Sequence, residues 1–206
     1  MTSEPGQTAV PGTLDELPTL SDPRMMRALA HPARIAIWTH LGFRGPATAT
    51  ECAEVAGLSP SACSYHLRTL AKYGFVEEDR DAAADGRERP WRARLVYFHI
   101  SGDPGVPPAT QLAGQLLAEN MRVAAEDLRA RYLARKSEYP ADWQNAAGEL
   151  FSAAYVTAAE LDEMRAKVVE VMTPYLRLDP AERPAGTLPV RIVLDAFPWF
   201  GPEEAR

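Results

Sequence analysis

The chain has 206 residues, with 22 Lys and Arg against 28 Asp and Glu, which gives a formal net charge of −6. No apolar run is long enough to cross a membrane, and the N-terminal residues lack a signal-peptide pattern, so we expect a cytoplasmic protein with no membrane partner. The two cysteines fall on predicted inward helix faces, which favours small core residues over a disulfide.

The N-terminal segment predicts a tail followed by two helices. Residues 1–20 are rich in Pro, Gly, Thr and Ser, which indicates a loose tail. Ser21 or Asp22 is expected to cap a first helix, with a proline just inside it. A second helix start is predicted at His31 and the proline that follows. His31 and His40 could be metal ligands, but we expect each to be a cap or a surface residue, because no set of His, Cys or carboxylate ligands lies near them.

Residues 48–72 predict two helices joined by a tight turn. Thr48 and Glu51 form a capping box at the start of the first helix, and Gly57 supplies the left-handed residue that ends it. Ser59 caps the second helix, whose first position is a proline that needs no hydrogen-bond partner. The residues expected to face the core are Cys52, Val55 and Ala56 in the first helix and Cys63, Leu67 and Leu70 in the second.

The opposite face of the second helix is short and polar near its start and cationic near its end. It carries Ser61, Tyr65, Arg68 and Lys72 at helical spacing, with Ala62 and Ser64 beside them. Such a face suits a helix in the major groove of DNA, with hydroxyl groups near base edges and cations near phosphates. An ordinary solvated helix face is the alternative, and this helix alone does not decide between the two.

A polar loop between two strand candidates follows the second helix. The strands are expected at residues 75–79 and 91–100, and the loop between them contains an Asp-Gly turn signal. Arg87, Arg89 and Arg92 cluster at the far end of this loop. An arginine-bearing loop beside two such helices predicts a clamp on phosphates or in the minor groove. A solvated hairpin is the alternative, because acidic residues in the loop dilute its charge.

Three stretches of the first half carry a family resemblance: DPRMMRALAHPARIAIWTHL, TATECAEVAGLSPSACSYHLRTLAKYGFVEED and GRERPWRA. Together they resemble the winged helix-turn-helix domain of the ArsR-like bacterial repressors, from Asp22 to about Ile100. The resemblance implies a mainly α fold with a small β wing. It also implies that the recognition helix binds DNA through Ser61, Ala62, Ser64, Tyr65 and Arg68. The arginines near Gly86 would make the contacts of the wing.

The charge distribution agrees with this resemblance. Residues 22–100 carry 11 Lys and Arg against 9 Asp and Glu, a net charge of +2, whereas residues 101–206 carry 11 against 16, a net charge of −5. The residues predicted to bind double-stranded DNA are Arg44, Thr48, Ser59, Ser61, Ala62, Ser64, Tyr65, Arg68, Lys72, Arg87, Arg89 and Arg92. The acidic net charge keeps an alternative open, a winged-helix protein-interaction module that no longer binds DNA.

Metal, cofactor and catalytic sites are not expected. Many ArsR-like proteins sense metals through paired cysteines, often Cys-x-Cys, on the first helix of the motif. Here that helix carries only Cys52, and Cys63 lies within the second helix, so thiolate ligands for a metal are lacking. The sequence has no glycine-rich phosphate loop, nucleophile elbow or zinc-hydrolase signature, which argues against an enzyme.

The second half predicts a helical C-terminal region. The winged helix-turn-helix domain is expected to span residues 21–101, and residues 102–206 begin with a linker rich in Gly and Pro. Residues 109–136 predict a helix of about 40 Å. Its apolar stripe is expected to pack against a second copy, because dimeric helix-turn-helix proteins place their recognition helices about 34–36 Å apart. Packing on the last long helix of the same chain is the alternative.

Three further elements are expected after that helix. A shorter helix is predicted within residues 139–155, another begins at Thr157 with Glu160 in a second capping box, and residues 188–197 are a late strand candidate. The region is rich in aromatic and methionine side chains, which fits either a plain core with a dimer interface or, less favoured, a pocket for a small apolar effector. The candidate ligand-binding residues are Trp143, Phe151, Tyr155, Met172, Tyr175, Phe197 and Trp199.

The sequence as a whole predicts a homodimeric DNA-binding transcriptional regulator, and it favours a repressor over an activator.

Overall fold

The computed structural model describes residues 16–79, 89–100, 105–176 and 183–198. The N-terminal half contains β1 (Thr19–Leu20), α1 (Pro23–Leu29), α2 (Pro32–Arg44), α3 (Ala49–Ala56), α4 (Pro60–Lys72), β2 (Val76–Glu78), β3 (Trp91–Ala93) and β4 (His99–Ile100). The C-terminal half contains α5 (Pro108–Ala134), α6 (Ala141–Ala146) and α7 (Ala158–Met172), with short 3-10 turns at Lys136–Glu138 and Thr173–Tyr175. The predicted fold class, mainly helical with a small β wing, is confirmed.

The helices of the N-terminal domain begin where side chains can cap them. Asp22 accepts a hydrogen bond from a first-turn amide of α1, and the Nδ1 atom of His31 does the same for α2. The predicted capping box of Thr48 starts α3, and Ser59 caps α4. Gly57 ends α3 at a φ of 64°, a left-handed conformation that favours glycine. The predicted helix starts are thus confirmed.

The buried core joins α1–α4, the base of the wing and the first half of α5. Its largest fully buried side chains are Phe75, Met26, Leu29, Ile35, Ile37, Leu67, Leu70 and Leu117. The predicted inward face of α4 is confirmed. The predicted inward position of Val55 is wrong, because α3 packs on both α2 and α4 and so buries Cys52 and Ala53 while Val55 remains 44% exposed.

The wing strands are shorter than predicted, and the N-terminal tail is less loose near its end. β2 and β3 pair antiparallel, with Glu77 opposite Arg92, but β3 ends at Ala93. There the Trp38 indole donates a hydrogen bond of 2.5 Å to the Leu95 carbonyl, which draws the chain away from β2. Residues 99–100 form β4 instead, which pairs parallel with β1 and places Leu20 in the core at 2% exposure.

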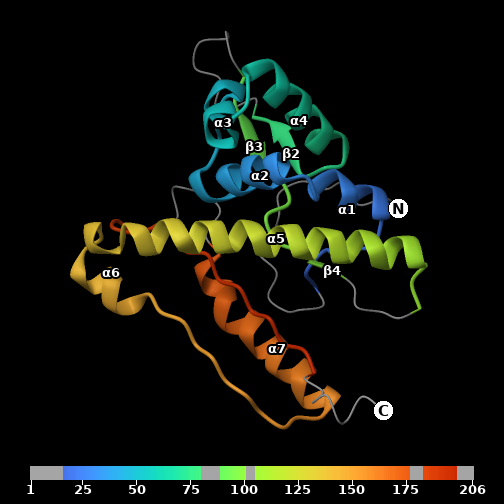
Figure 1. Ribbon diagram of the computed structural model, residues 1–206, viewed down its shortest axis with the longest axis vertical. Coiled ribbons are helices and arrows are strands. Elements are labelled where there is room, and N and C mark those ends of the chain that lie inside the picture. Colours follow the sequence, from blue (N-terminus) through green and yellow to red (C-terminus); the bar gives the residue numbers. More distant parts are fainter. Residues whose placement is uncertain (1–15, 80–88, 101–104, 177–182, 199–206) are drawn as a thin grey trace.

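Helix α5 is confirmed near its predicted bounds and lies beneath the N-terminal domain (Figure 1). Its first half packs against α1 and α2, where Ala113 and Leu117 are buried. Gly114 allows a close approach to β4, because a Cβ atom there would lie 2.9 Å from the Ile100 side chain. The domain that carries α4 is therefore fixed to one end of a 27-residue helix.

The C-terminal half departs most from the predictions. The helix expected within residues 139–155 covers only α6, and residues 148–156 are extended. The late strand predicted at residues 188–197 is wrong, because that segment is extended but pairs with no described strand. Helix α7 begins at its predicted capping box, but its predicted inner face is largely exposed, with Met164 at 50% and Val171 at 68%. None of the helices in the described ranges could span a membrane.

Candidate nucleic-acid interface

Helix α4 lies at the outer edge of the N-terminal domain, on the side away from α5 (Figure 1). Ser61, Tyr65, Arg68 and Lys72 are exposed along it, and Tyr65 is 60% exposed. Ala62 and Ser64 are half-buried beside them. The structure therefore brings these six predicted residues together on one outward face, opposite the buried face of the same helix.

Some of the hydroxyl groups near this face already form hydrogen bonds within the chain, and others do not. Thr48 donates to the Glu51 carboxylate at 2.9 Å and accepts from the Glu51 amide at 3.2 Å, so its hydroxyl serves the capping box. Ser64 donates to the Pro60 carbonyl, and Ser59 accepts from the Ala62 amide. Ser61 and Tyr65 have no hydroxyl hydrogen bond to a described residue, which makes them the hydroxyls best placed to meet base edges.

The arginine and lysine side chains of α1–α4 form no ion pair with any described carboxylate. We call them the unpaired cations: Arg24, Arg27, Arg34, Arg44, Arg68 and Lys72. Lys72 instead lies over the Tyr73 ring, 5.6 Å from its centroid. In contrast, the ion pairs of the described chain all lie on the wing and in the C-terminal half. Positive charge is thus left uncompensated on α1–α4, as phosphate binding requires.

One member of this set, Arg34, lies beside the α4 face and was not predicted from the sequence. Its guanidinium donates to the Arg27 carbonyl at 3.2 Å, and its Nε atom is buried without a described partner. Burial lowers the pKa of Arg34, and the nearby Tyr65 hydroxyl partly opposes this. This interaction places a cation next to Tyr65 on the outward face of α4.

Two histidines whose rings lie close together accompany Arg34. The rings of His31 and His66 have centroids 4.8 Å apart, and the His66 ring also meets that of Tyr65 edge-on. Burial is the main cause that lowers the pKa of both histidines, with Arg34 adding to it, so both are neutral at neutral pH. A sequence signal for this cluster did exist, because residues 23–50 contain four arginines and no acidic residue.

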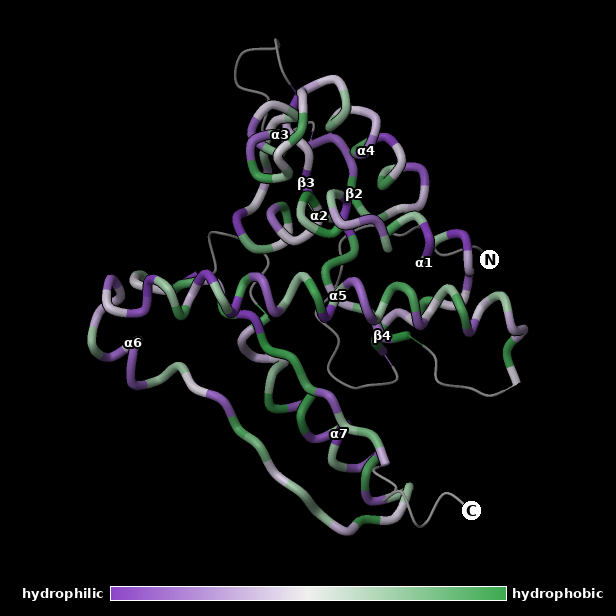
Figure 2. Tube along the Cα trace, viewed as in Figure 1, coloured by the Kyte–Doolittle hydropathy of each residue, from purple (hydrophilic) through white to green (hydrophobic). Residues whose placement is uncertain are grey.

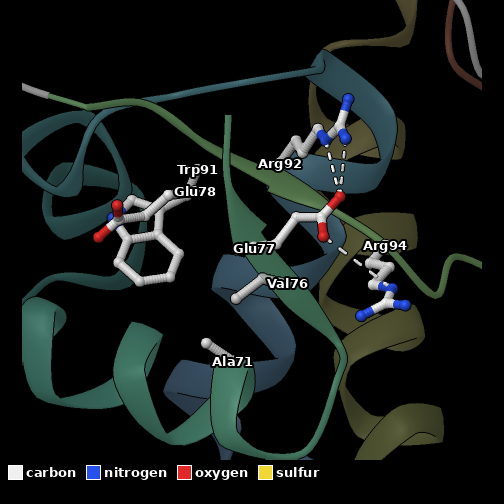
Figure 3. Close-up of a pocket in the computed structure, with 7 residues that line it drawn as sticks. All are labelled: Ala71, Val76, Glu77, Glu78, Trp91, Arg92 and Arg94. Carbon is white, nitrogen blue, oxygen red and sulfur yellow. Dashed lines mark hydrogen bonds and ion pairs between the residues drawn. The ribbon is translucent and has the colours of Figure 1, made fainter. Parts of the chain in front are cut away.

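The arginines predicted on the wing are held by glutamates. Arg92 bonds Glu77 through Nη2 at 2.8 Å, and Arg94 approaches the other oxygen of the same carboxylate at 4.0 Å. Figure 3 shows Glu77 between these two arginines, in an open hollow of about 560 Å³ that Trp91 also lines. Arg89 pairs with Glu78 at 3.3 Å. Arg87 lies outside the described residues.

Replacing Glu77 by Gln is expected to strengthen DNA binding, because the change removes a negative charge and releases Arg92. If Arg92 then reaches a phosphate, the slope of log K against log salt should steepen by about 0.9 for each copy bound. Fluorescence anisotropy at several salt concentrations measures this slope. The matched control is Glu163→Gln on α7, which also releases a cation, Lys167, but far from α4. An unchanged slope in Glu77→Gln would show that Arg92 does not meet DNA.

The two cysteines are core residues, as predicted. Both thiols are free and fully buried, one on α3 and the other on the inward face of α4. Burial, with smaller contributions from Cys63 and Glu51, raises the pKa of Cys52 to about 12, and burial raises the pKa of Cys63. Both therefore remain neutral thiols at neutral pH, which disfavours nucleophilic or redox chemistry at either one.

Neither cysteine is expected to react quickly with a thiol reagent in the folded protein. Thiolate is the reactive form, and burial suppresses both its formation and access to it. A colorimetric disulfide reagent at pH 8 should detect no fast thiol in the native protein and two thiols in guanidinium chloride. A fast native reaction would place one of the cysteines at the surface.

The residues proposed for a small-molecule pocket are dispersed. Phe151 is 86% exposed, Tyr155 109%, Tyr175 72% and Phe197 74%, so none of these four lies in an enclosed pocket of a single chain. Trp143 and Met172 are half-buried on α6 and α7, and Trp199 lies outside the described residues. An effector site built from these residues would need a second chain to enclose it.

The geometry defines a winged helix-turn-helix domain with a cation-bearing recognition helix. A model of the helix-turn-helix domain family matches residues 29–79. The chain is 35% identical over 97 residues to a probable mercury resistance operon repressor of Streptomyces lividans, a match that covers 47% of this chain and 67% of that protein. It belongs to the ArsR-like winged helix-turn-helix transcriptional regulators and is a DNA-binding regulator.

Two further proteins are similar to part of the chain. The HTH-type transcriptional regulator NmtR of Mycobacterium tuberculosis is 44% identical over 55 residues, which cover 27% of this chain and 45% of NmtR. A homodimeric winged helix-turn-helix DNA-binding domain of Mycobacterium bovis, a possible ArsR-family regulator, is 24% identical with a TM-score of 0.31, over 52% of this chain and 81% of that one. These relatives are named as regulators, and none of them as an enzyme.

Proposed function

We propose that this protein is a homodimeric repressor that reads the major groove of its operator with α4. The observation that carries the proposal is the set of unpaired cations on α1–α4, in a chain whose other described arginines are largely ion-paired. Ser61, Tyr65 and Arg68 meet base edges, while Arg34, Arg44 and Lys72 hold phosphates on either side. A protein-interaction module would need an acidic partner to use this local excess of positive charge, whereas DNA supplies the negative charges directly.

The exposed side of α5 supports the proposed homodimer. Its first half buries one side against the N-terminal domain, yet Leu112, Leu116 and Val123 are 66%, 49% and 55% exposed on its other sides. A helix of 27 residues is about 40 Å long. Two such helices packed together can set two copies of α4 about 34–36 Å apart, the spacing of successive major grooves on one face of DNA.

Salt-dependent DNA binding is the test. Fluorescence anisotropy with DNA from upstream of the protein's own gene should give tight binding at low salt, and Arg34→Gln should reduce the salt slope by about two units per dimer, since each copy loses one phosphate contact. The matched control is Arg131→Gln on α5, where an exposed arginine pairs with Asp127 far from α4.

Two results would contradict the proposal. Binding that is equally weak for operator and unrelated DNA, at low and at physiological salt, would favour the protein-interaction module. An unchanged slope in Arg34→Gln, with normal affinity, would remove Arg34 from the interface while leaving α4 to be tested separately.

A further inference from the structure

The large apolar side chains that remain exposed are concentrated in the C-terminal half. Twenty such residues are exposed in the described chain, and only Val55 and Tyr65 lie before residue 105. The N-terminal domain thus buries its own apolar residues, whereas the C-terminal half does not. A surface of this kind on a single chain marks an interaction site or an aggregation hazard.

Two extended segments make up much of this surface, together with α7. Residues 148–156 leave α6 and run away from α5 to the start of α7, and residues 188–198 run beside α7 (Figure 1). We call the two segments and α7 the C-terminal frame. Figure 2 shows hydrophobic stretches on all three parts of it. Leu150, Phe151 and Tyr155 are 93%, 86% and 109% exposed on the first segment.

The backbone of both segments is also unpartnered. Neither residues 148–156 nor residues 188–198 make a backbone hydrogen bond to another described residue. The second segment reads LPVRIVLDAFP, rich in the β-branched residues that favour strands, and Ile192, Val193 and Leu194 are each about half exposed. Such a segment can add to another chain by strand pairing, which would satisfy its amides and cover its side chains together.

We propose that the C-terminal frame is a dimer interface. Residues 148–156 and 188–198 of each copy would pack on the frame of the other copy. This inference deepens the homodimer proposed above and rests on it. The frame is continuous with the exposed side of α5, because Glu149, at the root of the first segment, forms an ion pair with Arg129 of α5. A single two-fold interface could therefore cover both α5 and the frame.

The size of the exposed surface identifies the partner as a second copy. At about 180 Å² for each fully exposed large apolar side chain, the eighteen residues of the C-terminal half expose roughly 2,000 Å² per chain. That area lies in the range of obligate homodimers and far exceeds what a small molecule covers. An apolar surface this large needs a permanent partner from the time of synthesis, and another copy of the same chain is always present in equal amount.

The charges of the frame fit a second copy better than an acidic partner. On α7, Arg165 pairs with Asp162 and Lys167 with Glu163, and the α5 residues Arg122 and Arg131 pair with carboxylates one turn away. These cations are already neutralised within the chain, so they offer little attraction to an acidic protein. The same pairs lower the repulsion between the polar borders of two copies.

Sedimentation equilibrium of the full chain tests the assembly. The wild type should be a dimer, and the double variant Phe151→Asp with Tyr155→Asp should raise the dissociation constant by at least about 100-fold, because it buries two charges in the interface. The matched control is Val55→Asp, an exposed apolar residue on α3, which should leave the dimer intact. A monomeric wild type, or a double variant as dimeric as the control, would overturn the proposal.

Hydrogen exchange of the wild type gives an answer that does not depend on how the variant folds. The amides of residues 148–156 and 188–198 should be protected in the dimer, although the described residues of a single chain offer them no backbone partner. If they exchange at the unprotected rate in a dimer that still binds operator DNA, this inference fails and the proposed function stands. If the amides are protected but operator DNA is not bound, the interface stands and the repressor assignment fails.

Discussion

The double variant Tyr65→Ala with Arg68→Ala is expected to lose specific DNA binding, with affinity for the operator falling at least about 100-fold. Each well-made contact to a base edge contributes about 1–3 kcal/mol of discrimination, and a dimer loses four contacts at once. Both side chains are exposed on α4, so their removal leaves the core face of that helix untouched. Anisotropy with operator and unrelated DNA measures the loss.

Control measurements on this variant separate a loss of DNA recognition from a loss of folding or of dimer formation. The double variant should keep the sedimentation mass and the thermal midpoint of the wild type, because neither side chain is buried. Weak binding to unrelated DNA should persist at low salt, since five of the six unpaired cations remain. Retention of operator affinity would show that α4 does not carry the reading face.

The N-terminal domain could be predicted in detail because its signals are local. A side-chain cap such as Ser59 and a left-handed glycine such as Gly57 act within one turn of the helix, and the spacing of Cys63, Leu67 and Leu70 fixes the inward face of α4. Such features depend little on the rest of the fold. The prediction for Val55 was wrong because residue spacing alone does not show that a short helix packs between two other helices. Here α3 packs on both α2 and α4, which changes the side of α3 that is buried.

The C-terminal half was predicted less well because its signals depend on partners. Residues 188–197 have the composition of a strand, but a strand forms only when another edge accepts its hydrogen bonds. The single chain offers none among its described residues. Likewise the apolar face of α7 was predicted from its spacing, yet Val171 stays 68% exposed. In both cases the sequence pattern calls for a packing surface that the described residues of one chain do not provide.

The net charge of the chain argues against the proposed DNA-binding site, whereas the pairing of its charges supports that site. The chain carries −6 overall, which by itself disfavours DNA binding. However, the acidic excess lies in the C-terminal half, where much of it neutralises neighbouring cations one turn away. What matters at a phosphate is the local field within about 8–10 Å at physiological salt. There α1–α4 present arginines without described acidic partners.

The proposed recognition of DNA by α4 also depends on how firmly the end of this helix is tied to the wing, and Phe75 makes that connection. Its side chain is fully buried and meets the Phe98 ring edge-on, with centroids 6.4 Å apart. Its amide donates to the Leu70 carbonyl at the end of α4, and its carbonyl accepts from the Arg94 amide at 3.0 Å, beyond β3. One residue therefore links the recognition helix, the ribbon and the aromatic core.

Replacing Phe75 by Ala is expected to lower the free energy of unfolding by about 3–5 kcal/mol, because the change removes a buried ring and leaves a cavity. Typical domains have only about 5–15 kcal/mol in total, so this variant should approach the unfolding threshold. Phe75→Leu keeps most of the volume and should cost less than about 1.5 kcal/mol. Urea denaturation at one fixed protein concentration, followed by circular dichroism, compares the two, since the stability of a dimer depends on concentration. If Phe75→Ala matches Phe75→Leu, the ring is not part of the core, and α4 is held by other contacts.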